Sequence, residues 1–408
     1  MKLKTSIFFT ILLSSTSFAQ DWFSAQKVTQ HISILAADSL GGRATGSPFE
    51  EKAANYIIKQ FKSNNIEPKG ENGTWLQQFD FSAGLHGTGG RTGKANNVIG
   101  YLDNKAKYTV VIGAHYDHLG DGSDGHSLDG HPEGKIHNGA DDNASGVAGV
   151  IELARYFSQN NQTEAFNFLF ICFSGEELGL LGSVYFCEHP TIDISSINCM
   201  INMDMIGRLP KENASLAVSG TGTTALFETL VKKFENGALK ITTDSAGVGP
   251  SDHTSFYNKG IPVLHFFSGT HSDYHKPSDD IEKINAQGAE VILLIIAGLI
   301  EQLPQNEKLA FLKTRNPTMG TSAKFKVTMG IMPSYANTDN GLKVEAVLEG
   351  KAAMKAGMKD GDIITQIGDY PVKEIQTYME ALGKFNKGDK TKIKLTREKQ
   401  EIVLEVEF

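Results

Sequence analysis

Cysteine is scarce in this sequence: its 408 residues include only Cys172, Cys187 and Cys199. So small and odd a number argues against a disulfide framework, and it excludes a zinc site built from several cysteines. Cys172 lies in the apolar run 168–173, which predicts that it is a small buried residue. Cys187 and Cys199 could pair, and the sequence leaves that open.

Positive charge is also limited. Lys and Arg total 39 against 47 Asp and Glu, so the formal net charge is −8. Because phosphate binding depends on clustered Lys and Arg, nucleic acid is not an expected partner.

Long apolar runs are missing as well: the stretch 291–299 is far shorter than the roughly 20 residues of a membrane span and predicts a buried helix. With 40% hydrophobic residues, the chain can still build a packed core.

The N-terminus has the pattern of an export signal. Lys2 and Lys4 precede the apolar run 7–13, and small residues occupy the −3 and −1 positions of a cleavage site between Ala19 and Gln20. We therefore expect residues 1–19 to be removed. The mature protein is expected to be periplasmic or secreted, without a membrane span.

Apolar runs alternate with segments of helical periodicity. Strands are predicted at 97–101, 108–113, 166–173 and 196–203, and helices at 47–64, 144–156 and 178–187. This alternation predicts an α/β fold with a mixed, mostly parallel sheet flanked by helices. Ligand sites in such folds gather at the carboxyl ends of the strands.

The composition changes after Leu303, which predicts a domain boundary. We expect a first domain at 20–305, a linker at 306–322 and a second domain at 323–408. The last segment contains short strand-like runs, turn signals and one predicted helix at 374–382. It is therefore expected to be a small, mainly β domain.

Imidazole and carboxylate groups recur at the ends of the predicted strands. Each group alone is weak evidence, but so many carboxylates brought together would repel one another without a cation. Mixed His and carboxylate ligands suit zinc, and two His with three acids suffice for two ions bridged by one carboxylate. The sequence therefore predicts a metal site built from five segments: 115–118, 139–146, 174–177, 202–204 and 274–280.

These segments read HYDHLG, GADDNASG, SGEELGLLGS, NMDMIG and YHKPSD. Over about residues 25–303 they resemble the secreted bacterial di-zinc aminopeptidases, which are relatives of glutamate carboxypeptidase and glutaminyl cyclase. The resemblance implies a zinc exopeptidase-like fold and two bound Zn²⁺ ions. It also implies hydrolysis of the N-terminal peptide bond of peptides with a free N-terminus, by a metal-bridging water that Glu176 activates.

The resemblance also implies a role for each matching residue. Glu176 is the general base, and Tyr274 donates its hydroxyl to the developing oxyanion. The expected metal ligands are His115 and Asp204 for one ion, Glu177 and His275 for the other, and Asp142 as the bridge between them.

The surroundings of the site can be predicted in less detail. Asp117 is placed to accept the second ring N–H of His115. The segment 251–256 resembles the substrate-side loop of the family, so His253 is expected to line the pocket. The peptide bond after Asp142 is expected to be cis. Three further residues are expected to be structural or solvent-facing: His118, Asp141 and Asp279.

The C-terminal region has a resemblance of its own. Residues 328–332 are similar to the carboxylate-binding loop of PDZ domains, and 352–364 resemble their central signature. A PDZ-like domain binds a peptide C-terminus by adding a strand to a sheet edge. Alternatively, the domain is a stabilising appendage with an empty groove.

Three other functions remain open from the residues alone. A carboxypeptidase of the same fold would use the same metals and differ only in its substrate pocket. A glutaminyl cyclase is less favoured, because the chain keeps all five ligands. An inactive protein that binds peptides through the PDZ-like groove would be indicated by a broken ligand set, which this sequence does not have.

Overall fold

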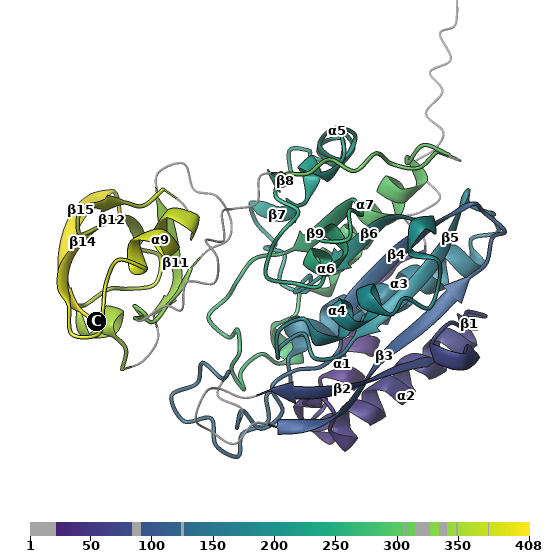
Figure 1. Cartoon of the computed structure of the whole chain (residues 1–408), viewed down its shortest axis with the longest axis horizontal. Coiled ribbons are helices and arrows are strands. Elements are labelled where there is room, and N and C mark those ends of the chain that lie inside the picture. Colours follow the sequence, from purple (N-terminus) through teal and green to yellow (C-terminus); the bar gives the residue numbers. More distant parts are fainter. Residues whose placement is uncertain are drawn as a thin grey trace, which may run out of the picture.

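The computed structural model describes residues 22–83, 91–123, 126–305, 307–314, 327–333, 341–347, 350–373 and 375–408. The predicted export signal at 1–19 lies outside these residues. The described residues form two sheets, each with a hydrophobic core of its own (Figure 1).

The first sheet has nine strands among the described residues, and its centre is parallel. Strands β5, β4, β6 and β9 run parallel, whereas β3 and β7 pair antiparallel with β5 and β9. This confirms the mixed, mostly parallel sheet. In spatial order the strands are β1 (Glu67–Pro68), β3 (Arg91–Leu102), β5 (Phe166–Phe173), β4 (Tyr108–His115), β6 (Ile197–Met203), β9 (Val263–Phe267), β7 (Ala214–Ser219) and β8 (Leu239–Asp244), and β2 (Leu76–Ala83) pairs with β3.

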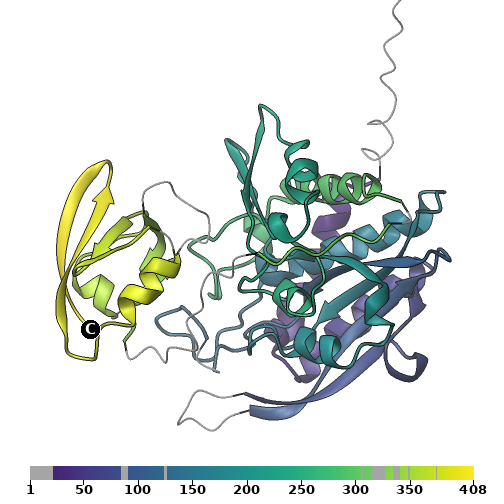
Figure 2. The ribbon, with the colours of Figure 1, turned by 45° about the horizontal axis from the view of Figure 1, so that its top comes forward.

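Helices cover both faces of this sheet (Figures 1 and 2). Because side chains alternate along a strand, β4 contributes to two cores. Val110 and Ile112 belong to the larger core, and Val111 packs in a second cluster with Phe186 and Phe256. The larger core includes α1 (Ala25–Leu35), α2 (Pro48–Ser63), α3 (Gly146–Gln159), α5 (Phe227–Lys232) and α7 (Ala286–Glu301), and the second includes α4 (Leu181–Glu188) and α6 (His253–Tyr257).

Two predicted helices illustrate how the sequence sets these elements. The side chain of Ser47 caps α2 by accepting a hydrogen bond from the backbone N–H of Glu50, and Pro48 opens the helix. The run 291–299 lies within α7 and buries Ile292 and Ile296, which confirms a buried helix there. Among the described residues, no helix has the length and apolarity to cross a bilayer.

The second sheet is antiparallel throughout its described pairs. Its strand order is β10-β11-β12-β14-β15, with β13 paired to β12, and this confirms a small, mainly β region. Arg397 ties β14 to the turn before β12 through two 2.7 Å contacts with Asp362. The elements are β10 (Ile331–Pro333), β11 (Leu342–Val347), α8 (Ala352–Lys355), β12 (Ile363–Ile367), β13 (Tyr370–Pro371), α9 (Ile375–Leu382), β14 (Lys390–Arg397) and β15 (Gln400–Glu407).

Part of the predicted linker 306–322 packs onto the first domain. Leu309 is buried in the larger core, and Phe311 packs against Tyr257 of the second cluster. The backbone N–H and hydroxyl of Thr314 each lie 3.0 Å from the hydroxyl of Tyr257. Residues 315–326 lie outside the described residues, so the remainder of the predicted linker and the predicted start of the second domain stay predictions.

The three cysteines are free thiols, and all three are buried. Cys172 is fully buried in β5, as its apolar surroundings predicted. Cys187 and Cys199 do not form the disulfide that the sequence left open.

Candidate metal centre

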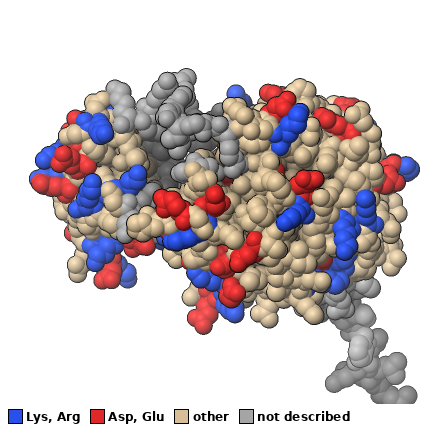
Figure 3. Space-filling view, turned by 90° about the horizontal axis from the view of Figure 1, so that it is seen from below, with Lys and Arg blue, Asp and Glu red and all other residues tan. Residues whose placement is uncertain are grey.

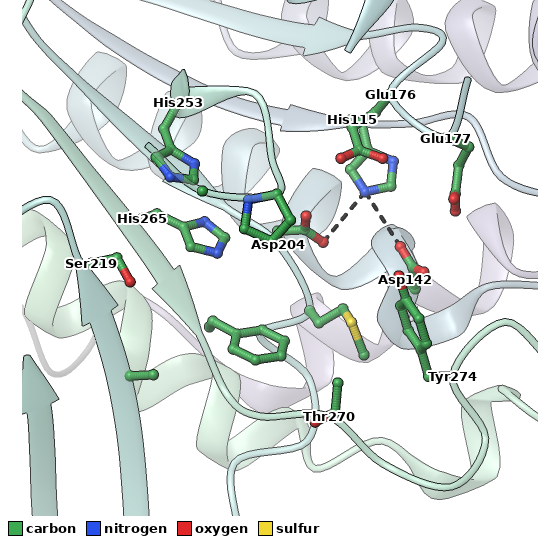
Figure 4. Close-up of a pocket in the computed structure, with 15 residues that line it drawn as sticks. His115, Asp142, Glu176, Glu177, Asp204, Ser219, His253, His265, Thr270 and Tyr274 are labelled. Atoms are coloured by element: carbon green, nitrogen blue, oxygen red, sulfur yellow. Dashed lines mark hydrogen bonds and ion pairs between the residues drawn. The ribbon is translucent and has the colours of Figure 1, made fainter. Parts of the chain in front are cut away.

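The predicted site residues meet at one edge of the first sheet. His115 ends β4, Glu176 and Glu177 follow β5, and Asp204 follows β6. Asp142 lies in the turn Ala140–Ser145 that leads into α3. Parallel strands bring their carboxyl ends to the same edge, which is why segments far apart in the sequence converge here. Figure 4 shows these side chains around a single cavity.

Asp142 lies between two groups of potential ligands. Its Oδ1 is 3.3 Å from Nε2 of His115, and that nitrogen is also 3.3 Å from Oδ1 of Asp204. Its Oδ2 is 3.3 Å from Nε2 of His275, and that nitrogen is 3.0 Å from Oε2 of Glu177. The two carboxylate oxygens therefore face two different His–carboxylate pairs.

The two imidazoles are held with Nε2 turned toward these carboxylates. Nδ1 of His115 lies 3.2 Å from the backbone carbonyl of Asp117, and Nδ1 of His275 lies 3.0 Å from that of His126. A carbonyl can only accept, so each Nδ1 carries a proton, and each Nε2 is the ring nitrogen that can bind a metal in exchange for its own proton.

Asp117 contacts His115 differently from the prediction. Its backbone carbonyl, rather than its carboxylate, lies within hydrogen-bond distance of the ring, because the carboxylate is 3.7 Å away. That carboxylate instead accepts hydrogen bonds from the hydroxyl of Thr45 at 2.9 Å and the backbone N–H of Glu176 at 3.2 Å. Asp117 thus links the ends of β4 and β5.

Glu176 and Glu177 diverge from the end of β5 (Figure 4). Glu177 lies in the ligand group, whereas Glu176 lines the cavity beside His115. Burial raises the pKa of Glu176 well above its usual value, although the charge of His115 lowers it. Adjacent residues thus hold one carboxylate within the ligand cluster and the other on the cavity wall.

His118 was expected to be structural or solvent-facing, and it lies inside the ligand cluster. It is buried, and its Nδ1 lies 2.7 Å from Oε1 of Glu177 and 3.8 Å from Oδ2 of Asp142. Two groups of side chains could each hold an ion, and they share Asp142: one adds His115 and Asp204, and the other adds His118 and Glu177.

Asp141 and Asp279 are also buried and support the turn that carries Asp142. Oδ2 of Asp279 accepts hydrogen bonds from the backbone N–H groups of Asp141 at 2.9 Å and Asp142 at 3.0 Å. Asp141 in turn accepts from the backbone N–H of Gly207 and contacts Nε2 of His271 at 3.2 Å. The peptide bond between Asp142 and Asn143 is cis, as the resemblance implied.

Arg43 is a supporting residue that the sequence did not indicate. Its guanidinium is buried and donates hydrogen bonds at 2.6–3.0 Å to four backbone carbonyls, including those of Asn138 and Gly139 just before the turn. Burial lowers its pKa to about 10. Its partners come from three separate segments, so no local motif could have identified it.

The cavity extends from the ligands to a second wall. Tyr274 stacks on His275 with ring centroids 3.9 Å apart, and His253 also lines the cavity. Two further lining residues, His265 and Ser219, could not be predicted, since β9 and β7 were not predicted. Burial lowers the pKa of His265 to about 4, so its imidazole is neutral near pH 7.

The residues present fit a metal centre. Burial lowers the pKa of His275, but the carboxylates of Glu177 and Asp142 together outweigh that effect and raise it well above its usual value. Without a metal, the carboxylates are therefore balanced by protons on the imidazoles, and a cation can take the place of those protons. Nitrogen and carboxylate donors in this mixture match zinc.

In fold, the chain resembles solved zinc-dependent exopeptidases. The chain is similar to the Zn-dependent exopeptidase from Parabacteroides distasonis, with 19% identity, a TM-score of 0.54 and coverage of 69% of this chain and 98% of that one. It is likewise similar in fold to the LapA aminopeptidase of Legionella pneumophila, with 21% identity, a TM-score of 0.54 and coverage of 74% and 78%.

The protein belongs to Peptidase family M28, whose profile matches residues 97–300, and a PDZ domain profile matches residues 327–408. It is 28% identical to leupeptin-inactivating enzyme 1 of Streptomyces exfoliatus over 62% of this chain and 50% of that protein. It is 29% identical to aminopeptidase YwaD of Bacillus subtilis over 49% of this chain and 42% of that protein. The chain thus spans half or less of the length of these two relatives.

Proposed function

We propose that this protein is an aminopeptidase that holds two zinc ions and hydrolyses the N-terminal peptide bond of peptides. The observation that carries the proposal is the position of Asp142, whose two oxygens face separate His–carboxylate pairs. Its relatives in Legionella and Bacillus are named aminopeptidases, which supports the same activity here.

We assign the five predicted ligands to the two ions. His115 and Asp204 would hold one ion, Glu177 and His275 the other, and Asp142 both. His275 is preferred over His118 as a ligand because a carbonyl engages its Nδ1, and its Nε2 is turned toward the carboxylates of both Asp142 and Glu177. His118 instead lies at hydrogen-bond distance from Glu177 and is suited to orient that carboxylate.

When bound, two zinc ions would lower the pKa of a water molecule and polarise the scissile carbonyl. Glu176 lies on the cavity wall, where it can accept a proton from the attacking water and pass it to the leaving amine. Tyr274 lines the same cavity, and burial raises the pKa of its hydroxyl well above the usual value. The hydroxyl therefore stays protonated and can donate to the developing oxyanion.

The charges of the cavity favour an aminopeptidase over a carboxypeptidase. A carboxypeptidase needs a cation to hold the free carboxylate of its substrate. Among the described lining residues there is no Lys or Arg, whereas four are carboxylates: Asp142, Glu176, Glu177 and Asp204.

The test is hydrolysis of aminoacyl-nitroanilides by the chain that begins at Gln20. We expect release from substrates with a free amine, loss of release with chelator, recovery with zinc, and no release after N-acetylation. Binding of two zinc ions without release from any free substrate would contradict the proposal and favour a carboxypeptidase or a binding role. Detection of the processed chain in the periplasm or medium would test the predicted export.

We further propose that the C-terminal region binds a peptide C-terminus. β10 is an edge strand of the described sheet, and it follows the loop in which the backbone N–H of Gly330 bonds to Thr328. An edge strand offers backbone groups to an added strand. Binding of peptides with free but not amidated C-termini would support this role, and equal binding of both forms would contradict it.

A further inference from the structure

The far wall of the cavity, opposite the metal ligands, is built from paired residues of two strands. Strands β7 and β9 are antiparallel, with Ser219 opposite His265 and Ala217 opposite Phe267. Residues directly opposite each other project from the same face, with Cβ atoms about 4.5–5.5 Å apart. All four side chains line the cavity. Figure 4 shows Ser219 and His265 on the side away from Glu177 and Tyr274.

A hydrogen bond fixes the proton on His265. The side-chain amide nitrogen of Asn202 lies 3.1 Å from Nδ1 of His265. An amide NH₂ group can only donate, so Nδ1 accepts and the ring proton is on Nε2. The wall therefore presents an N–H donor beside the hydroxyl of Ser219, which can donate or accept.

His253 adds unused hydrogen-bonding capacity to the same wall. It stacks on His265 with ring centroids 4.5 Å apart and an interplanar angle of 8°. Neither of its ring nitrogens has a hydrogen-bond partner among the described residues, although the side chain is buried. Buried polar atoms are normally paired, so a ligand that supplies partners would be favoured here.

We propose that this wall is the pocket for the first side chain of the substrate and that it selects a carboxamide, as in Asn or Gln, over an apolar side chain of equal size. A carboxamide offers one acceptor and two donors, which match His265 and Ser219. A carboxylate fits less well, because the described lining contains several acids and no Lys or Arg. The inference rests on the proposed aminopeptidase activity.

The test uses the nitroanilides of Asn, Leu and Asp, whose side chains have nearly the same shape. We expect kcat/KM for Asn to exceed that for Leu and for Asp by about tenfold or more, since a site with polar partners penalises an analogue that lacks them. Ser219→Ala and His265→Phe should each lower the Asn-to-Leu ratio toward one. Ser215→Ala, an exposed position on the same strand, should leave the ratio unchanged.

The outcomes separate this inference from the proposed function. Faster hydrolysis of the Leu substrate than of the Asn substrate would overturn the pocket assignment, while the aminopeptidase activity would stand. A preference for Asn that both Ser219→Ala and His265→Phe retain would also overturn the pocket assignment. Faster hydrolysis of Asp would point to recognition of charge and would also overturn it. If the protein hydrolyses neither these three substrates nor any other free aminoacyl substrate, that result would overturn the proposed function and the inference with it.

Discussion

Asp279 accepts a hydrogen bond from the backbone N–H of Asp142 at 3.0 Å, and thereby holds the residue placed between the two ligand groups. The same oxygen accepts from Asp141, and the other oxygen pairs with Arg208 at 3.1 Å. The position of the Asp142 carboxylate thus depends on a residue more than a hundred positions later in the chain.

We expect Asp279→Asn to loosen this turn. The amide cannot replace a charged acceptor, and hydrogen bonds to charged groups contribute roughly 1.5–3 kcal/mol each. Loss of such outer contacts weakens metal binding by about 10–100-fold, so competition with a zinc chelator is the measurement. Asp80→Asn, at an exposed position in β2, is the control. Equal zinc affinity of Asp279→Asn and the wild type would show that the turn holds without this carboxylate.

The neighbouring acids Glu176 and Glu177 should respond differently to the same substitution. We expect Glu176→Gln to retain both zinc ions while kcat falls by about 10²–10⁴-fold, since only proton transfer is lost. Glu177→Gln should lose zinc, because a proposed ligand is removed. Metal analysis of the dialysed proteins beside nitroanilide kinetics separates the two effects. Zinc loss from Glu176→Gln would reverse the assignment.

The pair of His31 and Glu152 should make stability depend on pH. Burial raises the pKa of Glu152, but His31 at 3.2 Å and Arg155 at 2.8 Å outweigh it, so the folded pKa is lowered. A depressed carboxylate pKa stabilises the fold above the unfolded value, near 4.3, and that contribution is lost as pH falls through the folded pKa. Glu152→Gln should therefore destabilise the first domain most near pH 7.

Denaturant unfolding at several pH values checks this expectation. The difference in unfolding free energy between Glu152→Gln and the wild type should be about 1–3 kcal/mol near neutral pH and should shrink below pH ~4. Glu51→Gln, at an exposed position in α2, serves as the control. A difference that does not change with pH would mean that packing, rather than charge, explains the effect.

The three thiols should be unreactive in the folded protein. Cys172, Cys187 and Cys199 are buried, and burial raises their pKa values, to about 12 for the last two. Thiol labelling should therefore find no reactive group in the native state and three after unfolding, with or without reductant. Only one reactive thiol in the unreduced, unfolded chain would indicate a disulfide.

Much of the fold and of the candidate metal site could be predicted because their signals are local. The continuous apolar runs of β4, β5 and β6 identify buried strands, and the polar residues directly after them fall at one edge of the sheet. By contrast, β7 and β8 are short and only partly buried, so their patterns are weak. Without β7 and its antiparallel pairing with β9, the cavity wall of Ser219 and His265 could not be placed.

Contacts between distant segments are the other feature that could not be predicted from the sequence. Asp279 was expected to be structural or solvent-facing, and no sequence pattern indicates that its partners are the N–H groups of the Asp142 turn. The role of Arg43 was not predicted for the same reason, since its acceptors are backbone carbonyls that carry no sequence signature. Side chain to backbone contacts of this kind become visible only once the chain is folded.

The packing of residues 307–314 against the first domain has a practical consequence for dividing the chain. A truncation after residue 305, at the predicted boundary, would uncover the surfaces that Leu309 and Phe311 cover and would remove the hydrogen-bond contacts between Thr314 and Tyr257. A fragment intended to carry the metal centre alone should therefore extend through Thr314. Its stop codon belongs after that residue.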